Sequence, residues 1–197
     1  MKARVKKTLA DIPDITDIEA ELKREKYKNQ YGVVLRSTIY TLVTVAAVAI
    51  LVATLWLPVL QIYGESMTPT LQDGDIVLSL KGEKFATGDV IAFYYNNKIL
   101  VKRVIASSGD WVDIADDGAV YVNGQELEEP YLGEKALGEC NIKLPYQVPE
   151  SKVFVMGDHR SVSIDSRNTS VGCIAQEQIV GRLVFRLWPL SGLGLIQ

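Results

Sequence analysis

Hydrophobic and polar positions follow three different patterns along the chain. Residues 1–36 are rich in charge, and Ile15, Ile18 and Leu22 recur within them at roughly helical spacing. Residues 37–64 then contain no charged side chain at all. Beyond them, apolar and polar positions alternate, which is the period of a β-strand. The pattern therefore predicts a short helix, a long apolar helix and a β-rich domain, in that order.

The uncharged stretch predicts a retained membrane anchor. It is longer than the roughly 20 residues that a helix needs to cross a bilayer, whereas the apolar core of a cleavable signal sequence has only about 7–15. Because the basic residues precede it, we expect residues 1–36 in the cytoplasm, the anchor at 37–62 and residues 63–197 outside. A buried core helix is the alternative to an anchor. The charged segment is either a helix on the membrane face or a docking segment for a partner.

A series of short segments after the anchor carries the strand pattern, with turn-forming pairs such as Asn96-Asn97 between them. Because no long amphipathic helix lies among them, we predict a mainly β fold class, with an antiparallel, barrel-like domain. Residues 129–150 are weakly patterned and predict a loop-rich insertion. The predicted strands are residues 75–80, 90–95, 99–105, 112–114, 119–122, 153–156 and 179–185.

Composition excludes several classes of function. The formal net charge is −3 and the pI about 5.3, which argues against nucleic acid as a partner because phosphate binding needs a basic surface. One histidine and two scattered cysteines do not make a typical zinc site, and the motifs for phosphate loops and dinucleotides are absent. We expect no metal and no cofactor. Outside the membrane, a disulfide between Cys140 and Cys173 is one hypothesis.

Ser66, which closely follows the apolar stretch, is a candidate nucleophile with apolar neighbours in Met67 and Leu71. A serine needs a base near its hydroxyl. Lys102 is the candidate base, because it lies within an apolar strand where desolvation lowers the pKa of an amine toward neutrality. Strand alternation places Lys102 and Arg103 on opposite faces, so one of them points inward, and the pattern leaves open which one.

A polar cluster at residues 157–167 contains Ser163, Asp165 and Arg167. These three residues, here called the brace, are interpreted as an aspartate–arginine pair that holds a strand or a serine against the base. A plain polar loop is the alternative interpretation.

These motifs together resemble the ordered boxes of bacterial type I signal peptidases, over roughly residues 56–187. The resemblance implies a membrane-bound serine endopeptidase that removes signal peptides from exported preproteins at the outer face of the cytoplasmic membrane. It implies Ser66 as nucleophile, Lys102 as general base, Ser163 as a serine that hydrogen-bonds the lysine, and Asp165 with Arg167 as the bracing pair. The matching segments are residues 66–71, 74–75, 88–91, 102–105 with 109–110, and 157–167.

The same resemblance implies an extended substrate that pairs with a strand edge near the nucleophile or Lys102. Shallow pockets would then admit only small side chains at the first and third positions before the cut. The implied partners are signal peptides, membrane lipid and, by proximity, the secretion translocon, but no nucleic acid. The residues expected to line the pockets are Ile62, Met67, Leu71, Leu100 and Val101.

Two positions depart from the family pattern. Gly64 stands where some members carry a serine that completes the oxyanion hole, so we expect the Ser66 N–H to be the firm donor, with water or another backbone group beside it. His159 stands where asparagine is usual, either as a structural swap or as a source of pH sensitivity.

Other readings of the chain remain. A self-cleaving or specialised serine–lysine peptidase is one rival, and an inactive anchored domain that binds exported chains is another. The branch of the family that uses histidine as base is disfavoured by Lys102.

Overall fold

Residues 14–82 and 84–196 are described by the computed structural model. They divide into an N-terminal helical unit, which ends at Val52, and a β-rich unit that begins at Ala53. The first thirteen residues of the predicted cytoplasmic segment, with their basic side chains, lie outside the described residues.

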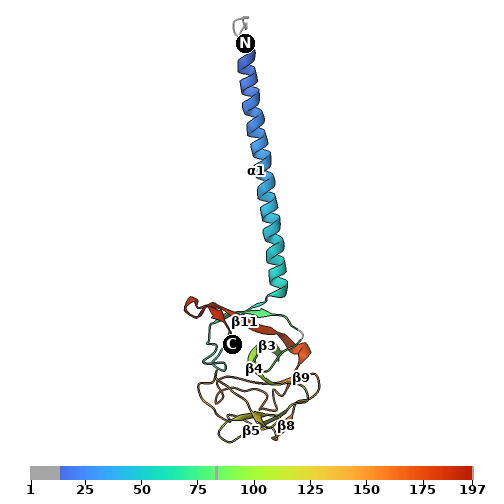
Figure 1. Cartoon of the computed structure of the whole chain (residues 1–197), viewed down its shortest axis with the longest axis vertical. Helices are drawn as coiled ribbons and strands as arrows, with labels where there is room; N and C mark the ends of the chain where they lie inside the picture. Colours follow the sequence, from blue (N-terminus) through green and yellow to red (C-terminus); the bar gives the residue numbers. More distant parts are fainter. Residues whose placement is uncertain (1–13, 83, 197) are drawn as a thin grey trace, which may run out of the picture. The chain divides into compact units, whose positions relative to one another are not determined.

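Helix α1 runs without interruption from Ile15 to Trp56 (Figure 1). The carboxylate of Asp14 accepts the Ile15 N–H at 2.8 Å, so this residue caps the helix. The charged helix and the apolar helix predicted from the sequence are therefore one element, because no proline separates them. The helix ends before Pro58, so Val59–Gln61, at the end of the predicted anchor, forms a strand instead.

The apolar part of α1 satisfies its own hydroxyl groups. Thr38, Thr41 and Thr44 each donate to the backbone carbonyl four residues earlier, at 2.8–2.9 Å. Such bonds remove the penalty of placing a hydroxyl in an apolar environment. Within the part of the chain that the structure describes, α1 is the one helix long and apolar enough to cross a membrane.

The β-rich unit contains two sheets, and every strand pair in them is antiparallel. The larger has the order β1-β2-β11-β3-β4-β9-β10, with β12 beside β11, and the smaller has the order β7-β6-β5-β8. Two short 3₁₀ helices, η2 (Gln176–Gln178) and η3 (Leu190–Gly192), flank β11. The strands are β1 (Val59–Gln61), β2 (Ile76–Leu80), β3 (Val90–Tyr95), β4 (Lys98–Ala106), β5 (Trp111–Ile114), β6 (Val120–Val122), β7 (Gln125–Glu126), β8 (Tyr146–Gln147), β9 (Lys152–Met156), β10 (Ile174–Ala175), β11 (Ile179–Trp188) and β12 (Gly194–Leu195).

The predicted fold class is confirmed, since each predicted strand is present and the sheets are antiparallel. The word barrel-like describes it only loosely, because the two sheets do not close. The sequence pattern misses β1, β7, β8, β10 and β12. Each of these has only two or three residues, too few for an alternating pattern to appear.

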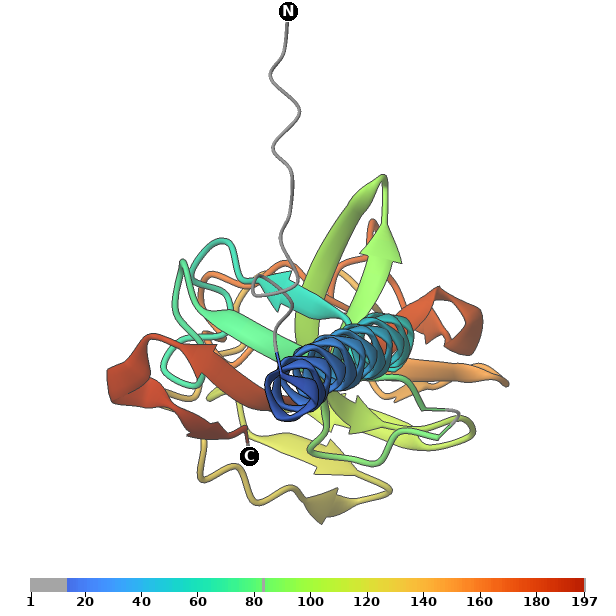
Figure 2. The ribbon, with the colours of Figure 1, turned by 90° about the horizontal axis from the view of Figure 1, so that it is seen from above.

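The predicted hairpin at Asn96-Asn97 is also confirmed. Both asparagines have positive φ, 45° and 61°, and Tyr95 pairs directly with Lys98 across the two-residue turn. The β3–β4 hairpin, lime green in Figure 2, projects from the body of the unit. Its register places Lys102 opposite Ile91, deep in the larger sheet.

Strand β4 is covered on both of its faces from Lys102 to Ala106. β3 pairs along one of its edges and β9 along the other. Lys102 is 4% exposed and Arg103 is 1% exposed. The prediction that only one of the two points inward is therefore wrong, because the alternation rule assumes a sheet with one solvated face and this strand has none.

Candidate active site

Ser66 is held on a loop whose apolar neighbours are buried. The loop connects β1 to β2, and two backbone hydrogen bonds join its two ends, from the Ile62 N–H to the Asp75 carbonyl (2.8 Å) and from the Gly74 N–H to the Ile62 carbonyl (3.0 Å). Met67, next to the serine, packs in a core cluster with Ile62. Because its neighbour is anchored in the core, the serine hydroxyl has a defined direction.

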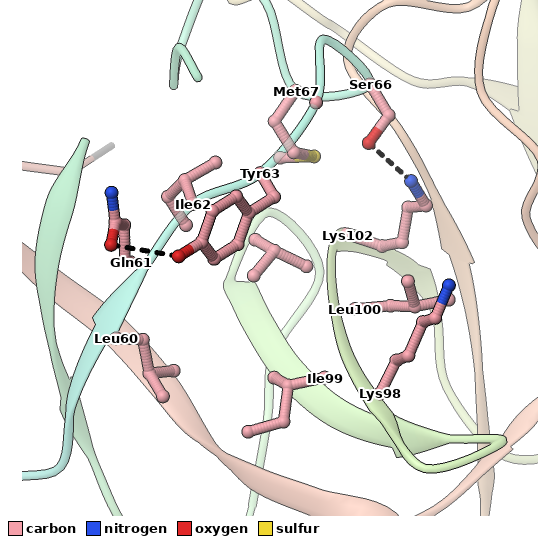
Figure 3. Close-up of a pocket in the computed structure, with 12 residues that line it drawn as sticks. Leu60, Gln61, Ile62, Tyr63, Ser66, Met67, Lys98, Ile99, Leu100 and Lys102 are labelled. Atoms are coloured by element: carbon pink, nitrogen blue, oxygen red, sulfur yellow. Dashed lines mark hydrogen bonds between the residues drawn. The ribbon is translucent and has the colours of Figure 1, made fainter. Parts of the chain in front are cut away.

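That hydroxyl meets the amine of Lys102. The Lys102 Nζ donates to the Ser66 Oγ at 2.6 Å (Figure 3). Burial lowers the pKa of Lys102 from its usual 10.5 to about 8, because the charged form is desolvated. The carboxylate of Asp165 acts in the opposite direction and raises this pKa, while Arg167 lowers it. About a tenth of the molecules therefore carry the neutral amine at pH 7, far more than for a lysine with its usual pKa.

The brace is fully connected. Asp165 accepts two bonds from Arg167, at 2.8 and 2.9 Å, and one from the backbone N–H of Gly157 at 2.9 Å. Ser163 donates its hydroxyl to the same carboxylate at 2.7 Å. All four groups are buried, so each charge and each donor is compensated within the protein.

The hydrogen bond of the Ser163 hydroxyl differs from the predicted one to Lys102. Its hydroxyl donates to Asp165, and among the described residues Lys102 donates to Ser66 alone. The buried carboxylate is the stronger acceptor for a hydroxyl, which explains the difference. The influence of Asp165 on Lys102 is electrostatic, since it appears in the pKa of the amine rather than as a hydrogen bond.

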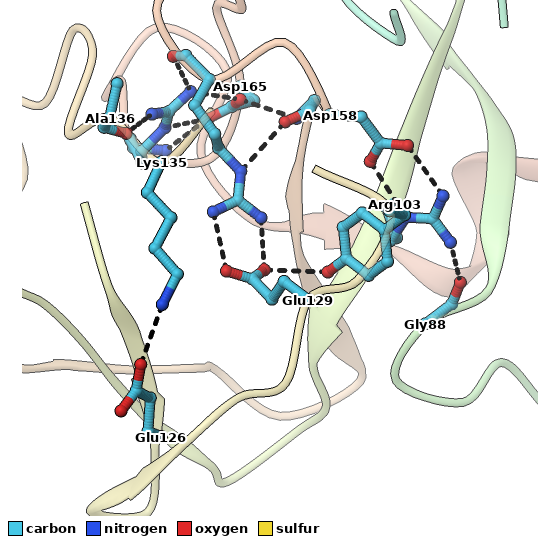
Figure 4. Close-up of polar contacts among 12 residues, drawn as sticks. Gly88, Arg103, Glu126, Glu129, Lys135, Ala136, Asp158 and Asp165 are labelled. Carbon is cyan, nitrogen blue, oxygen red and sulfur yellow. Dashed lines mark hydrogen bonds and ion pairs between the residues drawn. The ribbon is translucent and has the colours of Figure 1, made fainter. Parts of the chain in front are cut away.

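A second buried ion pair joins Arg103, the chain neighbour of Lys102, to Asp158 (Figure 4). Arg103 binds Asp158 through two bonds, at 2.9 and 2.7 Å, and donates to the Gly88 carbonyl at 2.8 Å. Thr70, from the nucleophile loop, donates to the same aspartate at 2.5 Å. The ring of Tyr131 covers the guanidinium at 3.8 Å. This pair therefore connects β4, the nucleophile loop and the segment that follows β9.

A third buried ion pair joins Glu129, at the start of the predicted loop-rich insertion, to Arg160. Glu129 accepts from both terminal nitrogens of Arg160, and Arg160 donates to the Gly157 carbonyl at 3.1 Å. Tyr131 donates its hydroxyl to Glu129 at 2.8 Å. Sequence reasoning missed Glu129 because a single carboxylate in a weakly patterned segment has no distinguishing signal.

An apolar cleft of about 720 Å³ opens beside the serine (Figure 3). β1 and the loop after it line one side, and the first half of β4 lines the other. Of the predicted pocket residues, Ile62, Met67, Leu100 and Val101 line this cleft. Leu71 does not: it is 0% exposed and packs in the core cluster that contains Met67, so its assignment to the pocket is wrong.

Both sides of the cleft offer unpaired strand edges. β1 is the outermost strand of the larger sheet, and β9 pairs with β4 only from Arg103 onward. Between these edges, the Ser66 N–H has no hydrogen-bond partner within the described residues. Gly64 takes a φ of 86° there, which glycine adopts without strain.

The disulfide hypothesis is not supported. Cys140 and Cys173 are both free thiols in the structure. Burial raises the pKa of Cys173, which makes its thiol less reactive.

A serine hydroxyl in contact with a buried lysine amine, beside an open cleft, defines the class of serine–lysine hydrolases. Comparison with known proteins gives the family. The sequence model of the signal peptidase family, peptidase S26, matches residues 35–188. The chain therefore belongs to the signal peptidase family, peptidase S26.

Two sequence relatives agree with this membership. Signal peptidase IB of Staphylococcus aureus is 41% identical over 150 residues, which is 66% of this chain and 77% of the relative. Thylakoidal processing peptidase 1 of Arabidopsis thaliana is 38% identical over 143 residues, 64% of this chain and 40% of the relative. A crystal structure of a signal peptidase I from Enterococcus faecalis matches 51% of this chain and 97% of its own, with 32% identity and a TM-score of 0.44.

Proposed function

We propose that this protein is a membrane-bound serine endopeptidase that cleaves signal peptides from exported preproteins, with Ser66 as nucleophile and Lys102 as general base. The observation that carries the proposal is the 2.6 Å contact between the two side chains, combined with the lowered pKa of the lysine. Membership in the signal peptidase family supplies the class of substrate.

In this mechanism the neutral Lys102 takes the Ser66 proton as the Oγ attacks the carbonyl of the last signal-peptide residue. The carbonyl π electrons move to the carbonyl oxygen, and the Ser66 N–H donates a hydrogen bond to the negative oxygen that results. The intermediate then collapses to an acyl-enzyme, and the departing amine, the new N-terminus of the mature protein, takes the proton from Lys102. A water molecule then attacks the ester carbonyl while Lys102 takes one of its protons. When the second tetrahedral intermediate collapses, the Ser66 Oγ leaves and takes that proton from Lys102, and the signal peptide is released as a carboxylic acid.

The cleft supports an extended substrate. A chain laid between the free edges of β1 and β4 gains backbone hydrogen bonds on both sides. The apolar lining by Ile62, Met67, Leu100 and Val101 favours small apolar side chains near the cut. Asp165 and Arg167 act in this proposal as positioning residues, because they fix the surroundings of Lys102 without reaching Ser66.

The helix α1 anchors the enzyme in the cytoplasmic membrane. Its apolar part is long enough to cross a bilayer. We place the N-terminus in the cytoplasm and the β-rich unit on the outer face, where signal peptides emerge from the secretion translocon. Membrane lipid is then a permanent partner of this protein.

Removal of either reacting group tests the proposal. Purified full-length protein in detergent is given a preprotein, and the new N-terminus is sequenced. We expect one cut after the signal peptide with the native chain and a loss of at least 10³-fold in rate with Ser66→Ala or Lys102→Ala. Both variants are expected to keep the native circular dichroism spectrum, and retained processing by either variant rejects the assignment.

A further inference from the structure

His159 contacts the nucleophile loop at two points. Its backbone N–H donates to the Ser66 carbonyl at 3.1 Å. Its ring Nδ1 lies 3.3 Å from the Glu65 carbonyl oxygen. A carbonyl oxygen only accepts hydrogen bonds, so this contact places the proton on Nδ1. The segment after β9 therefore binds both peptide groups that flank the serine.

The Glu65 carbonyl and the Ser66 N–H belong to the same peptide group. That carbonyl accepts a second bond, from the Thr68 N–H at 3.1 Å. Hydrogen bonds to a peptide oxygen polarise the whole group and make the N–H at its other end a stronger donor. In the part of the chain that is described, the Ser66 N–H itself has no partner, so its donor capacity is available for a ligand.

We propose that His159 is a positioning residue for the oxyanion hole, acting through the peptide group between Glu65 and Ser66. Its ring orients and polarises that group, so that the Ser66 N–H meets the negative oxygen of the tetrahedral intermediate. This inference rests on the proposed function. It differs from the role of Lys102, because His159 transfers no proton and does not touch the reacting atoms.

Two substitutions at His159, to side chains of similar shape, separate the hydrogen bond to the Glu65 carbonyl from the packing of the side chain. In His159→Asn the side-chain Nδ2 can take the place of Nδ1 as a donor to the Glu65 carbonyl. In His159→Leu the side chain has nearly the same size and branching but no donor. Both variants keep the backbone bond from residue 159 to the Ser66 carbonyl, since that bond uses the main chain.

The measurements are kcat and KM on a peptide that contains the cleavage site, with full-length protein in detergent. We expect His159→Leu to lower kcat by about 2- to 10-fold, the usual effect of one hydrogen bond, with KM unchanged. His159→Asn should stay within about 2-fold of the native kcat.

A peptide aldehyde that matches the signal-peptide side supplies a readout that packing alone would not move. The Ser66 Oγ adds to the aldehyde carbon as Lys102 takes its proton, and the carbonyl π electrons move to the oxygen, which is left negative in the hole as in the intermediate. We expect His159→Leu to raise the inhibition constant of the aldehyde by the same factor by which it lowers kcat. Affinity for the corresponding product peptide, which carries no such tetrahedral oxygen, should be unchanged.

Three results would overturn the role of His159: a native kcat in His159→Leu, an equal loss in both variants, or equal weakening of aldehyde and product peptide. The Ser66→Ala variant is measured in parallel. If that variant still cleaves the peptide, the proposed function itself fails, and this outcome is separate from any result at His159.

Discussion

At the scale of single residues, Lys102 combines burial with a function that needs a neutral amine. Its pKa is lowered to about 8, so only about a tenth of the molecules carry the neutral amine at pH 7. We expect kcat/KM to rise with pH toward about 8 and to level off above it. A pH–rate profile on a peptide substrate checks this, and a profile that is flat between pH 6 and 9 would contradict it.

The same burial makes a prediction about stability. The unfolded lysine keeps its usual pKa of 10.5, so between about pH 8 and 10.5 the unfolded state binds more protons and stability rises with pH. Below about pH 8 the full penalty of burying the charge is present. We therefore expect Lys102→Met to be inactive but more stable at pH 7, by on the order of 1–3 kcal/mol. Urea unfolding at pH 7 and at pH 10 should show this gain shrinking as pH rises, and a less stable variant at pH 7 would contradict the prediction.

Gly157 is a position where the addition of a single Cβ atom should disturb the site. A Cβ there would overlap the Ser163 hydroxyl and the Ser66 carbonyl oxygen. We expect Gly157→Ala to separate the brace from the nucleophile loop, with activity lost and stability lowered by about 1–3 kcal/mol. Gly133→Ala is the control, because its nearest neighbour, a carbon of Pro69, would be 3.9 Å away. Preprotein cleavage and thermal unfolding of both variants are the measurements, and near-native activity of Gly157→Ala would show that the loop can adapt.

At the scale of elements, the segment between β7 and β8 contributes to the site although it has no regular structure. Its Glu129 forms an ion pair with Arg160, and the ring of its Tyr131 covers the guanidinium of Arg103. The backbone carbonyl of Leu137 in this segment accepts from Arg167 at 2.6 Å. We interpret the segment as part of the support for the catalytic machinery rather than as an appended loop.

Two glutamates of this region test that interpretation. Glu129→Gln leaves Arg160 buried beside a neutral partner, and we expect a loss of about 3–5 kcal/mol in unfolding free energy together with reduced activity. Glu126→Gln makes the same chemical change at an exposed pair with Lys135, where water screens the charges, so we expect almost no change in unfolding free energy. Chemical denaturation of both variants gives the comparison, and equal losses would contradict the role of Glu129.

At the scale of the whole molecule, the anchor and the β-rich unit have separate tasks. In the proposed function, the helix restricts the enzyme to the membrane where preproteins arrive, and the β-rich unit carries every residue of the proposed chemistry. The orientation is tested with membrane vesicles. We expect trypsin to degrade the β-rich unit in right-side-out vesicles and to leave it intact in inverted vesicles until detergent is added. The opposite pattern would reverse the topology that we propose.

The comparison of sequence and structure follows the same scales. Local chemistry made the longer strands, the Asn96-Asn97 hairpin and the apolar helix predictable, because periodicity, turn propensity and hydropathy act over short stretches. The pairing of Ser66 with Lys102 was predicted through the resemblance to a family, since periodicity alone left open whether the lysine or Arg103 points inward.

What the sequence by itself determined was the kind of element at each place and the types of residue available for chemistry. The tertiary structure alone decided that Lys102 and Arg103 are both buried, that Ser163 binds Asp165, that Leu71 lies in the core and that Glu129 supports the site. The physical reason is that these outcomes depend on which strands and loops cover each other. Coverage sets both desolvation and the choice of partner, and it joins residues far apart in the chain, such as Arg103 and Asp158.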